Sequence, residues 1–220
     1  MAESGAVLNR AVLETQFADL EQQRETATFG MWVFLATELL LFGALFLAYT
    51  VYRYGAPEGF ADASQHMEKV IGAVNTAVLL SSSFMVATAV RGAQVGGRKR
   101  LLFGLALTIV LGVVFLFFKG YEYYLHYEDH KVPGLNFEYA GQYAQAAKLF
   151  FFFYFAMTGL HAVHMLIGLG LVSVMLVRSW RGVFTEEYHA PVEVVGLYWH
   201  FVDLVWIFLF PVFYLIVKHH

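Results

Sequence analysis

The sequence contains no cysteine and carries little charge. None of its 220 residues is Cys, and only 14% are Asp, Glu, Lys or Arg. The absence of thiols excludes disulfide bonds, thiolate metal sites, iron–sulfur clusters and thioether-linked haem. The formal net charge is −3 and the basic residues are dispersed, so the chain lacks the concentrated basic surface that nucleic acid requires. We expect no nucleic-acid partner.

The sequence is instead rich in apolar and aromatic residues. They make up 59% and 18% of the chain, which is more apolar surface than one soluble core of this size can bury. A helix needs about 20 apolar residues to cross the hydrocarbon layer of a membrane. Five stretches pass this test, at about residues 30–52, 70–91, 101–124, 147–177 and 192–217. The sequence therefore predicts an all-α integral membrane protein, a bundle of five transmembrane helices.

The distribution of basic residues predicts the orientation of this bundle. Arg91, Arg98, Lys99 and Arg100 lie within ten residues between the second and third spans, and loops rich in Lys and Arg stay in the cytoplasm. An odd number of spans then places the N-terminus in the cytoplasm and the C-terminus outside, on the periplasmic side. Residues 1–29 are predicted to form a polar cytoplasmic tail without a signal peptide, and residues 30–217 a single membrane domain.

Several ionisable residues fall inside the predicted spans. A charge near the bilayer centre costs about 2.5–3.5 kcal/mol on insertion scales, so each such group needs a partner or a protein-lined environment. In the fifth span, Glu193 and His200 lie within about 20° of each other on the helix, and Asp203 follows on a neighbouring row. The first span contains Glu38, for which proton handling, lipid headgroup binding and helix pairing are equally compatible with its chemistry.

The fourth and second spans carry further polar groups. His161 and His164 lie three residues apart on one side of the fourth span, and Gly168 on the same stripe allows close approach of another helix. We therefore expect a polar seam between spans four and five. In the second span, Asn75, Thr76 and Ser81–Ser83 are expected to form hydrogen bonds to other helices.

Two interpretations of the intramembrane histidines compete. His161, His164 and His200 are candidates for haem ligation, whereas a di-iron oxygenase would need more clustered histidines than these three. We favour a satisfied network between helices, with no catalytic, cofactor-binding or metal site in this chain. The predicted network comprises Asn75, His161, His164, Glu193, His200 and Asp203. Aromatic residues at predicted span ends are interpreted as anchors at the membrane surface; they are Trp32, Trp180, Tyr198 and Trp199.

An ordered set of short motifs resembles one known family over residues 30–217. The motifs are Gly30-Met31-Trp32 with Glu38, Asn75 to Leu80, Gly97-Arg98-Lys99, Glu122-Tyr123, Gly159 to His164 with Gly168, and Tyr198 to Trp206 preceded by Glu193. Each motif alone is weakly specific, whereas the complete set in this order is highly specific. The chain resembles subunit III of the haem–copper cytochrome c oxidases.

This resemblance implies a non-catalytic subunit of an aa3- or caa3-type oxidase in the bacterial cytoplasmic (inner) membrane. The implied partners are oxidase subunit I as the main contact, subunit II, cytochrome c as electron donor, and a respiratory supercomplex. Haem a, haem a3, CuB and CuA are expected in the partner subunits. In this chain we expect bound phospholipid, support of proton uptake and greater stability of the complex. Glu38 is the candidate for the lipid or proton environment, and cations near span ends are headgroup candidates; these are Arg91, Arg178 and His189.

The sequence also departs from the longer members of the family. Those members have two additional spans before the Gly-Met-Trp segment, where this chain has the polar residues 1–29. The alternatives are a quinol oxidase subunit III, an accessory protein of nitric oxide reductase and, from a different class, an independent membrane electron carrier that binds haem b. Glu38 favours the cytochrome c oxidase branch, because relatives in quinol oxidases tend to carry Asp at this position.

Overall fold

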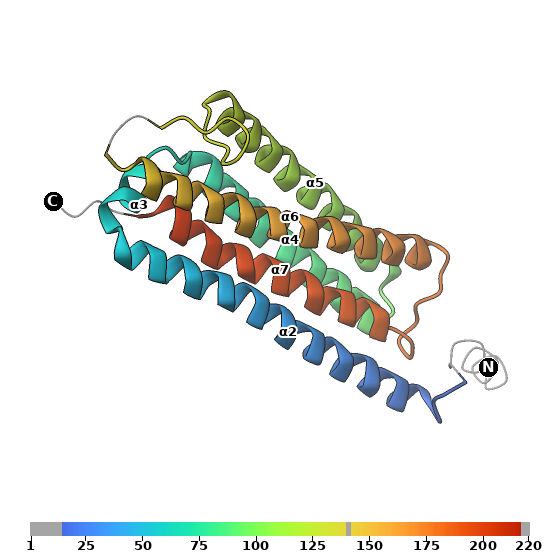
Figure 1. The fold of residues 1–220 in the computed structure, drawn as a ribbon. Coiled ribbons are helices and arrows are strands. Elements are labelled where there is room, and N and C mark those ends of the chain that lie inside the picture. The colour runs from blue at the N-terminus through green and yellow to red at the C-terminus, as the bar shows by residue number, and fades with distance from the viewer. Residues whose placement is uncertain (1–14, 140–141, 217–220) are drawn as a thin grey trace.

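The described part of the chain is entirely helical. The computed structural model describes residues 15–139 and 142–216, and within these ranges it contains no strand. Five helices are long and apolar enough to cross a membrane. They are α2 (Leu20–Gly55), α4 (Lys69–Gln94), α5 (Arg98–Glu128), α6 (Ala144–Trp180) and α7 (Ala190–Tyr214), with the short helix α3 (Pro57–Ser64) between the first two. Their long axes run side by side in one bundle (Figure 1). The prediction of an all-α bundle with five spans is confirmed.

The first long helix starts ten residues before its predicted beginning. The Asp19 side chain accepts a hydrogen bond of 2.7 Å from the backbone N–H of Gln22 and caps the helix. Residues 20–29, which the sequence placed in a polar tail, therefore form the first turns of α2. Its 36 residues correspond to about 54 Å, well beyond a hydrocarbon layer of about 30 Å. The prediction for residues 1–14 lies outside the described residues.

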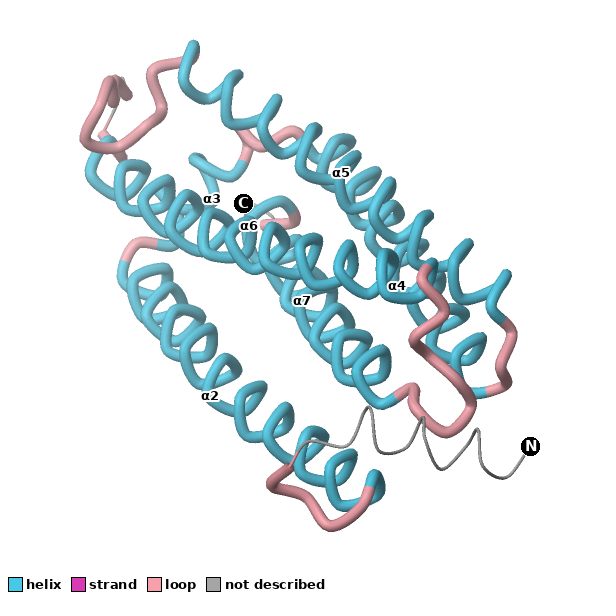
Figure 2. The backbone as a smooth tube through the Cα atoms, turned by 90° about the vertical axis from the view of Figure 1, so that its right-hand side faces the viewer, coloured by secondary structure: helices cyan, strands magenta, loops and turns pink. Residues whose placement is uncertain are grey.

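Helix α7 lies at the centre of the bundle and α2 at its edge. Large side chains of α7 are fully buried; they include Trp199, Trp206, Leu209 and Phe213. Helix α2 runs beside α7 along the outside of the bundle (Figures 1 and 2). It buries only Leu35, Phe42 and Tyr49, at intervals of seven residues. A single narrow stripe therefore holds α2 against its neighbours, and most of its surface is available to lipid or to another chain.

The central position of α7 overturns the anchor interpretation of Tyr198 and Trp199. Both side chains are buried, and the Trp199 indole donates a hydrogen bond of 3.0 Å to the Ser82 hydroxyl of α4. The indole lies against Gly168 of α6, where an added Cβ would be 3.1 Å from the ring, and Gly112 of α5, where it would be 2.9 Å away. The predicted close approach at Gly168 is confirmed. The two residues are core residues because their helix is enclosed by the others.

Hydrogen bonds between helices join α4 to α7 along their length. Besides the Ser82 contact, the Trp206 indole donates to the Thr76 hydroxyl at 3.1 Å, and the Ser83 hydroxyl lies 2.7 Å from Nδ1 of His200. The predicted cross-helix role of this serine and threonine group is confirmed for these three residues. Ser81 instead donates to the carbonyl of Ala77 within its own helix.

Tyrosine hydroxyls attach α3 to the residues before α6. Tyr139 donates to the Asp62 carboxylate at 2.6 Å, and Tyr143 donates to Glu58. Burial and the Asp62 carboxylate both raise the pKa of Tyr139, so its hydroxyl remains a donor at neutral pH. These contacts hold the end of the bundle that contains the α5–α6 loop, opposite the end that contains the α4–α5 turn.

Candidate functional site

Glu38 of α2 pairs with His164 of α6. The carboxylate Oε2 lies 3.0 Å from Nε2 of the imidazole, and the two side chains are only 16% and 10% exposed. The ring of Phe42, one turn beyond Glu38, covers the imidazole at a centroid distance of 5.4 Å. The sequence assigned His164 to a seam with span five, but its side chain turns to the first span instead.

The hydrogen bonds of His164 define how this pair holds its proton. Nδ1 lies 2.8 Å from the carbonyl oxygen of Leu160, and a carbonyl only accepts, so Nδ1 carries a hydrogen. Nε2 and the Glu38 carboxyl therefore share one further proton, as an ion pair or as two neutral groups. Either form has no net charge, which lowers the cost of placing it inside a membrane. A proton can thus move between Nε2 of His164 and the Glu38 carboxyl group without creating a buried net charge.

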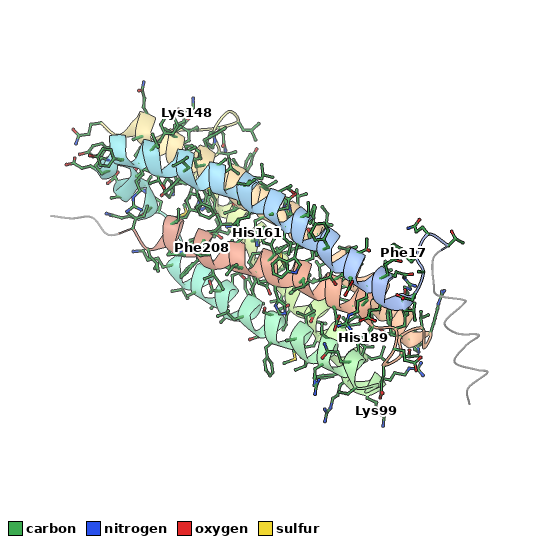
Figure 3. The ribbon with its side chains drawn as sticks, turned by 90° about the horizontal axis from the view of Figure 1, so that it is seen from below. Phe17, Lys99, Lys148, His161, His189 and Phe208 are labelled. Atoms are coloured by element: carbon green, nitrogen blue, oxygen red, sulfur yellow. The ribbon has the colours of Figure 1, made fainter. Side chains whose placement is uncertain are left out.

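Glu193 is the centre of a second cluster, at the α4–α5 end of the bundle. Its carboxylate lies 3.0 Å from the Arg24 guanidinium and 3.3 Å from Nε2 of His189. The Gln94 amide donates to it at 2.7 Å, and Arg91 donates in turn to the Gln94 oxygen at 3.4 Å. Figure 3 shows His189 at this end, with His161 near the middle of the bundle. Two of the predicted headgroup candidates, Arg91 and His189, therefore lie around one carboxylate.

The remaining predicted residues are distributed over separate contacts. Nε2 of His161 lies 3.1 Å from the carbonyl oxygen of Val202, which links α6 to α7 as the predicted seam required. Asp203 is 2% exposed, and the Ser83 hydroxyl interacts with it. Among the described residues, neither Asp203 carboxyl oxygen has a partner in normal hydrogen-bond geometry, and the fully buried Asn75 amide also lacks one. The Arg178 guanidinium lies 5.6 Å from the centroid of the Phe184 ring.

The geometry of the three intramembrane histidines does not favour haem ligation. His161 is packed against the rings of Phe115 and Trp206, at centroid distances of 5.5 and 5.3 Å. His164 uses both ring nitrogens, and His200 uses Nδ1 on Ser83. A haem needs an open face and an unengaged axial nitrogen directed at its iron. Nδ1 of His161 has no hydrogen-bond partner among the described residues, but the two rings packed against this imidazole occupy its surroundings. His164 has both ring nitrogens engaged.

A buried charge network in α5 was not found from the sequence. The Lys119 ammonium donates to Glu122 at 3.1 Å and to the hydroxyls of Tyr154 and Tyr214 at 2.8 and 2.9 Å. Tyr214 donates to the other Glu122 oxygen at 2.6 Å. Lys119 and Glu122 are almost fully buried, as is His126, whose Nε2 lies 3.9 Å from Glu122. The hydrogen bonds of Lys119 and Glu122 join α5 to α6 and α7, whereas among the described residues neither ring nitrogen of His126 has a hydrogen-bond partner.

The spacing in α5 contained a signal for this network. The sequence predicts that the third span ends at about residue 124. The observed helix continues to Glu128. Residues 119, 122 and 126 then lie on one helical face, because they are three and four positions apart.

Comparison with known proteins identifies similarity to one family. The family model described as cytochrome c oxidase subunit III matches residues 12–217. Cytochrome c oxidase subunit 3 of Synechocystis sp. is 34% identical, over 86% of this chain and 75% of the relative. Cytochrome c oxidase subunit 3 of Thermostichus vulcanus is 32% identical, over 86% of this chain and 87% of the relative. A probable quinol oxidase subunit 3 of Staphylococcus haemolyticus is 30% identical, over 85% of this chain and 87% of the relative.

Proposed function

Because this chain belongs to the cytochrome c oxidase subunit III family, we propose that it is the accessory subunit III of an aa3- or caa3-type cytochrome c oxidase. It is a multi-pass membrane protein and a subunit III of haem–copper oxidases, which associates with other oxidase subunits. The observation that carries the finer proposal is the match across residues 12–217, together with relatives named cytochrome c oxidase subunit 3 that align over most of both chains.

In the proposed complex this chain supports chemistry that takes place in other subunits. Cytochrome c donates electrons, haem a, haem a3, CuB and CuA lie in subunits I and II, and subunit I is the main contact. The proposed location is the bacterial cytoplasmic membrane, with the N-terminus in the cytoplasm. The contacts around His161 and His164 support this assignment of the haems. The exposed face of α2 and the shared proton of Glu38 and His164 suit phospholipid binding and proton supply, respectively.

Purification of the intact complex tests this proposal. An affinity tag on the chain is expected to recover, from native membranes, a haem- and copper-containing assembly that oxidises reduced cytochrome c with oxygen. The chain released from that assembly is expected to show no Soret band. Recovery without any haem-bearing partner, or a stoichiometric Soret band in the released chain, would refute the proposal. The second result would identify an independent haem-binding carrier.

A quinol oxidase subunit III is the second candidate. The alignment with the probable quinol oxidase subunit 3 of Staphylococcus haemolyticus covers 87% of that relative. Overall similarity therefore does not by itself distinguish cytochrome c from quinol as the electron donor. The discriminating assay gives the purified complex either reduced cytochrome c or a reduced quinol. Oxygen consumption with cytochrome c supports the first proposal, and consumption with quinol alone replaces it by the second.

Removal of the Glu38 carboxyl group is expected to shorten the time for which the complex stays active during turnover, and to leave the reduction of oxygen itself unchanged. Glu38→Ala leaves His164 without its partner, and an unpaired buried polar group costs about 1–3 kcal/mol. We expect normal haem and copper spectra and a normal initial rate, followed by faster loss of activity during turnover. Glu38→Gln keeps a hydrogen-bonding group but cannot hold the shared proton. Comparison of the Glu38→Ala and Glu38→Gln complexes therefore separates an effect on stability from an effect on proton supply.

Thr37→Ala provides the matched control for this experiment. Thr37 is the preceding residue on α2, is exposed, and donates a hydrogen bond to the carbonyl of Phe34 in its own helix. Its replacement is expected to leave both initial rate and durability unchanged. Immediate loss of the haem or copper spectrum in an assembled Glu38→Ala complex would show that this side chain has a different role.

A further inference from the structure

Asp203 is a buried carboxyl group without a charged partner in the described part of the chain. It lies on α7 and is 2% exposed, and neither of its oxygens has a partner there in normal hydrogen-bond geometry. An isolated carboxylate is very costly in an apolar interior, including the interior of a membrane protein. The protonated form of the carboxyl group is therefore the stable one. Asp203 thus holds a proton inside the bundle.

This proton lies about half a membrane away from the α4–α5 end. From Glu193 to Asp203 the chain advances ten residues along α7, which is about 15 Å in a helix. Half of a hydrocarbon layer is also about 15 Å. Bulk water does not reach the carboxyl group directly, since the side chain is buried at this depth. The proton can leave only through polar groups that connect Asp203 to a surface.

Two polar side chains lead from Asp203 toward the α4–α5 end. The Ser83 hydroxyl of α4 interacts with the carboxyl group and lies 2.7 Å from Nδ1 of His200. His200 precedes Asp203 by three positions on α7, so the two side chains lie on the same side of this helix. A hydroxyl accepts one hydrogen bond while it donates another. Ser83 can therefore accept from the Asp203 O–H and donate to the imidazole.

This series of side chains opens into a groove between α2 and α7. Two adjoining hollows of about 400 and 390 Å³, here called the α2–α7 groove, share Leu197 and His200. The first hollow extends to polar residues at the α4–α5 end, namely Arg24, Arg91, Gln94 and Glu193. Nδ1 of His200 is engaged with Ser83, so Nε2 is the ring nitrogen available to the groove. A hollow of this volume with several polar groups suits water.

Aromatic side chains end the series on the opposite side of Asp203, toward the α5–α6 end. Nε2 of His161 on α6 is engaged with the carbonyl of Val202, and the ring packs against Trp206 at a centroid distance of 5.3 Å. The Trp206 indole donates to the Thr76 hydroxyl at 3.1 Å. An indole N–H donates but does not accept, so it does not pass a proton on. Among the described residues, the polar contacts of Asp203 therefore lead toward the α4–α5 end alone.

Ionisable groups on the helices around Asp203 have partners of their own or lie in the end turns of a helix. The paired groups are Glu38 with His164 and Lys119 with Glu122. The groups in the first and last turns of α4 are Lys69 and Arg91. His200 is thus the group placed to exchange a proton with Asp203 through Ser83.

We propose that Asp203, Ser83 and His200 form a proton relay, which connects a carboxyl group in the middle of the bundle with water at the α4–α5 end. The sequence grouped Asp203 and His200 in a network that joins helices, and the structure adds the hydroxyl between them and the groove beyond them. The relay is distinct from the Glu38–His164 pair, which joins α2 to α6. It goes beyond the proposed function, because every group in it belongs to this chain and none needs an oxidase partner.

One proton moves along the relay in three transfers. The Asp203 O–H bond breaks and its proton bonds to the Ser83 oxygen, while the original Ser83 proton passes to Nδ1 of His200. The hydrogen on Nε2 then bonds to a water molecule in the groove. The products are the Asp203 carboxylate and a hydronium ion. The reverse transfers restore the protonated carboxyl group and the same imidazole tautomer.

Hydrogen–deuterium exchange at Asp203 tests the proposal. The purified full-length chain in mixed micelles is transferred to D2O, and its infrared spectrum is followed with time. A protonated carboxyl group absorbs separately from carboxylates, and its band shifts when O–H becomes O–D. The difference between wild type and D203N identifies the Asp203 band. We expect this band to shift before the backbone amides of the long helices exchange, because amides in packed helices open slowly.

Removal of either Ser83 or His200 is expected to slow this exchange about a hundredfold, the lower end of what a positioned proton-transfer group contributes. S83A removes the hydroxyl, and H200Q keeps a hydrogen-bonding group beside Ser83 but does not pass a proton on. S83T restores the hydroxyl and is expected to restore the rate. S81A is the matched control, because Ser81 is exposed on the same helix and donates to Ala77. It is expected to exchange like wild type.

A further pair of variants tests the exit through the groove. A87W places an indole in the polar hollow, which Ala87 lines, and is expected to slow exchange although the three relay side chains remain. G120W adds the same side chain on α5, where nothing lies within 4 Å of an added Cβ. It is expected to exchange like wild type. Circular dichroism checks that each variant keeps its helix content.

Several results would overturn the proposal. A carboxyl band that D203N does not change would mean that Asp203 carries no proton. A wild-type exchange rate in S83A or H200Q would mean that water reaches the carboxyl group without that side chain. Slow exchange in S83T, S81A or G120W would assign the effect to packing. A wild-type rate in A87W would place the exit outside the groove.

Discussion

Replacement of Glu122 by alanine is expected to lower the free energy of unfolding by about 3–5 kcal/mol, because it leaves the buried Lys119 ammonium without its counter-charge. Lys119 is 2% exposed and Glu122 is fully buried, so water cannot take over the lost contact. The Tyr214 hydroxyl also loses its acceptor. The measurement is equilibrium unfolding of the purified full chain in mixed micelles, followed by tryptophan fluorescence.

The double variant K119M/E122L is the decisive companion. It removes both charges and keeps apolar volume, and buried ion pairs replaced in this way are often neutral in stability. We expect the double variant to be more stable than Glu122→Ala. If both variants lose the same free energy, the individual side-chain contacts rather than the unpaired charge account for the effect.

Replacement of Trp199 by alanine is expected to cost a similar 3–5 kcal/mol for a different reason. The indole is fully buried between Gly112, Gly168 and Ser82. Neither glycine has a side chain that can fill the space, so the truncation leaves a cavity and lost van der Waals contacts. The Ser82 hydroxyl also loses its donor, so the variant combines a packing defect with a polar one.

Trp180→Ala is the matched control for this measurement. Trp180 is 74% exposed at the end of α6, and substitutions at exposed positions usually change stability by less than about 0.5 kcal/mol. The same unfolding assay is expected to separate the two tryptophans clearly. Comparable losses for both would mean that the packing around Gly168 does not control the stability of the bundle.

The sequence located most polar residues of the site but not their partners. It identified Glu38 and His164 as intramembrane groups that need partners. It assigned His164 to a seam between spans four and five, and it assigned no partner to Glu38. Their pairing depends on the rotation of α2 and α6 about their axes, and hydropathy along one helix does not define that rotation. The sequence places Arg24 in the polar tail of residues 1–29; as part of α2 it reaches Glu193.

The predicted third span, 101–124, assigns no partner to Lys119 or Glu122 near its end. A charge after an apolar run usually lies near the membrane surface. In the fold the same charges are enclosed by Tyr154 and Tyr214 from two other helices. Local composition cannot distinguish these two situations, since both place a charge after an apolar run.

The sequence by itself determined the five apolar helices, their order and the family, because span length and short motifs are properties of contiguous residues. Only the tertiary structure decided that α7 is central, that Trp199 is a core residue, and that α2 and α7 enclose a groove with arginines at one end. These features depend on which helices are neighbours and which faces meet. The energy that selects them comes from contacts between distant segments.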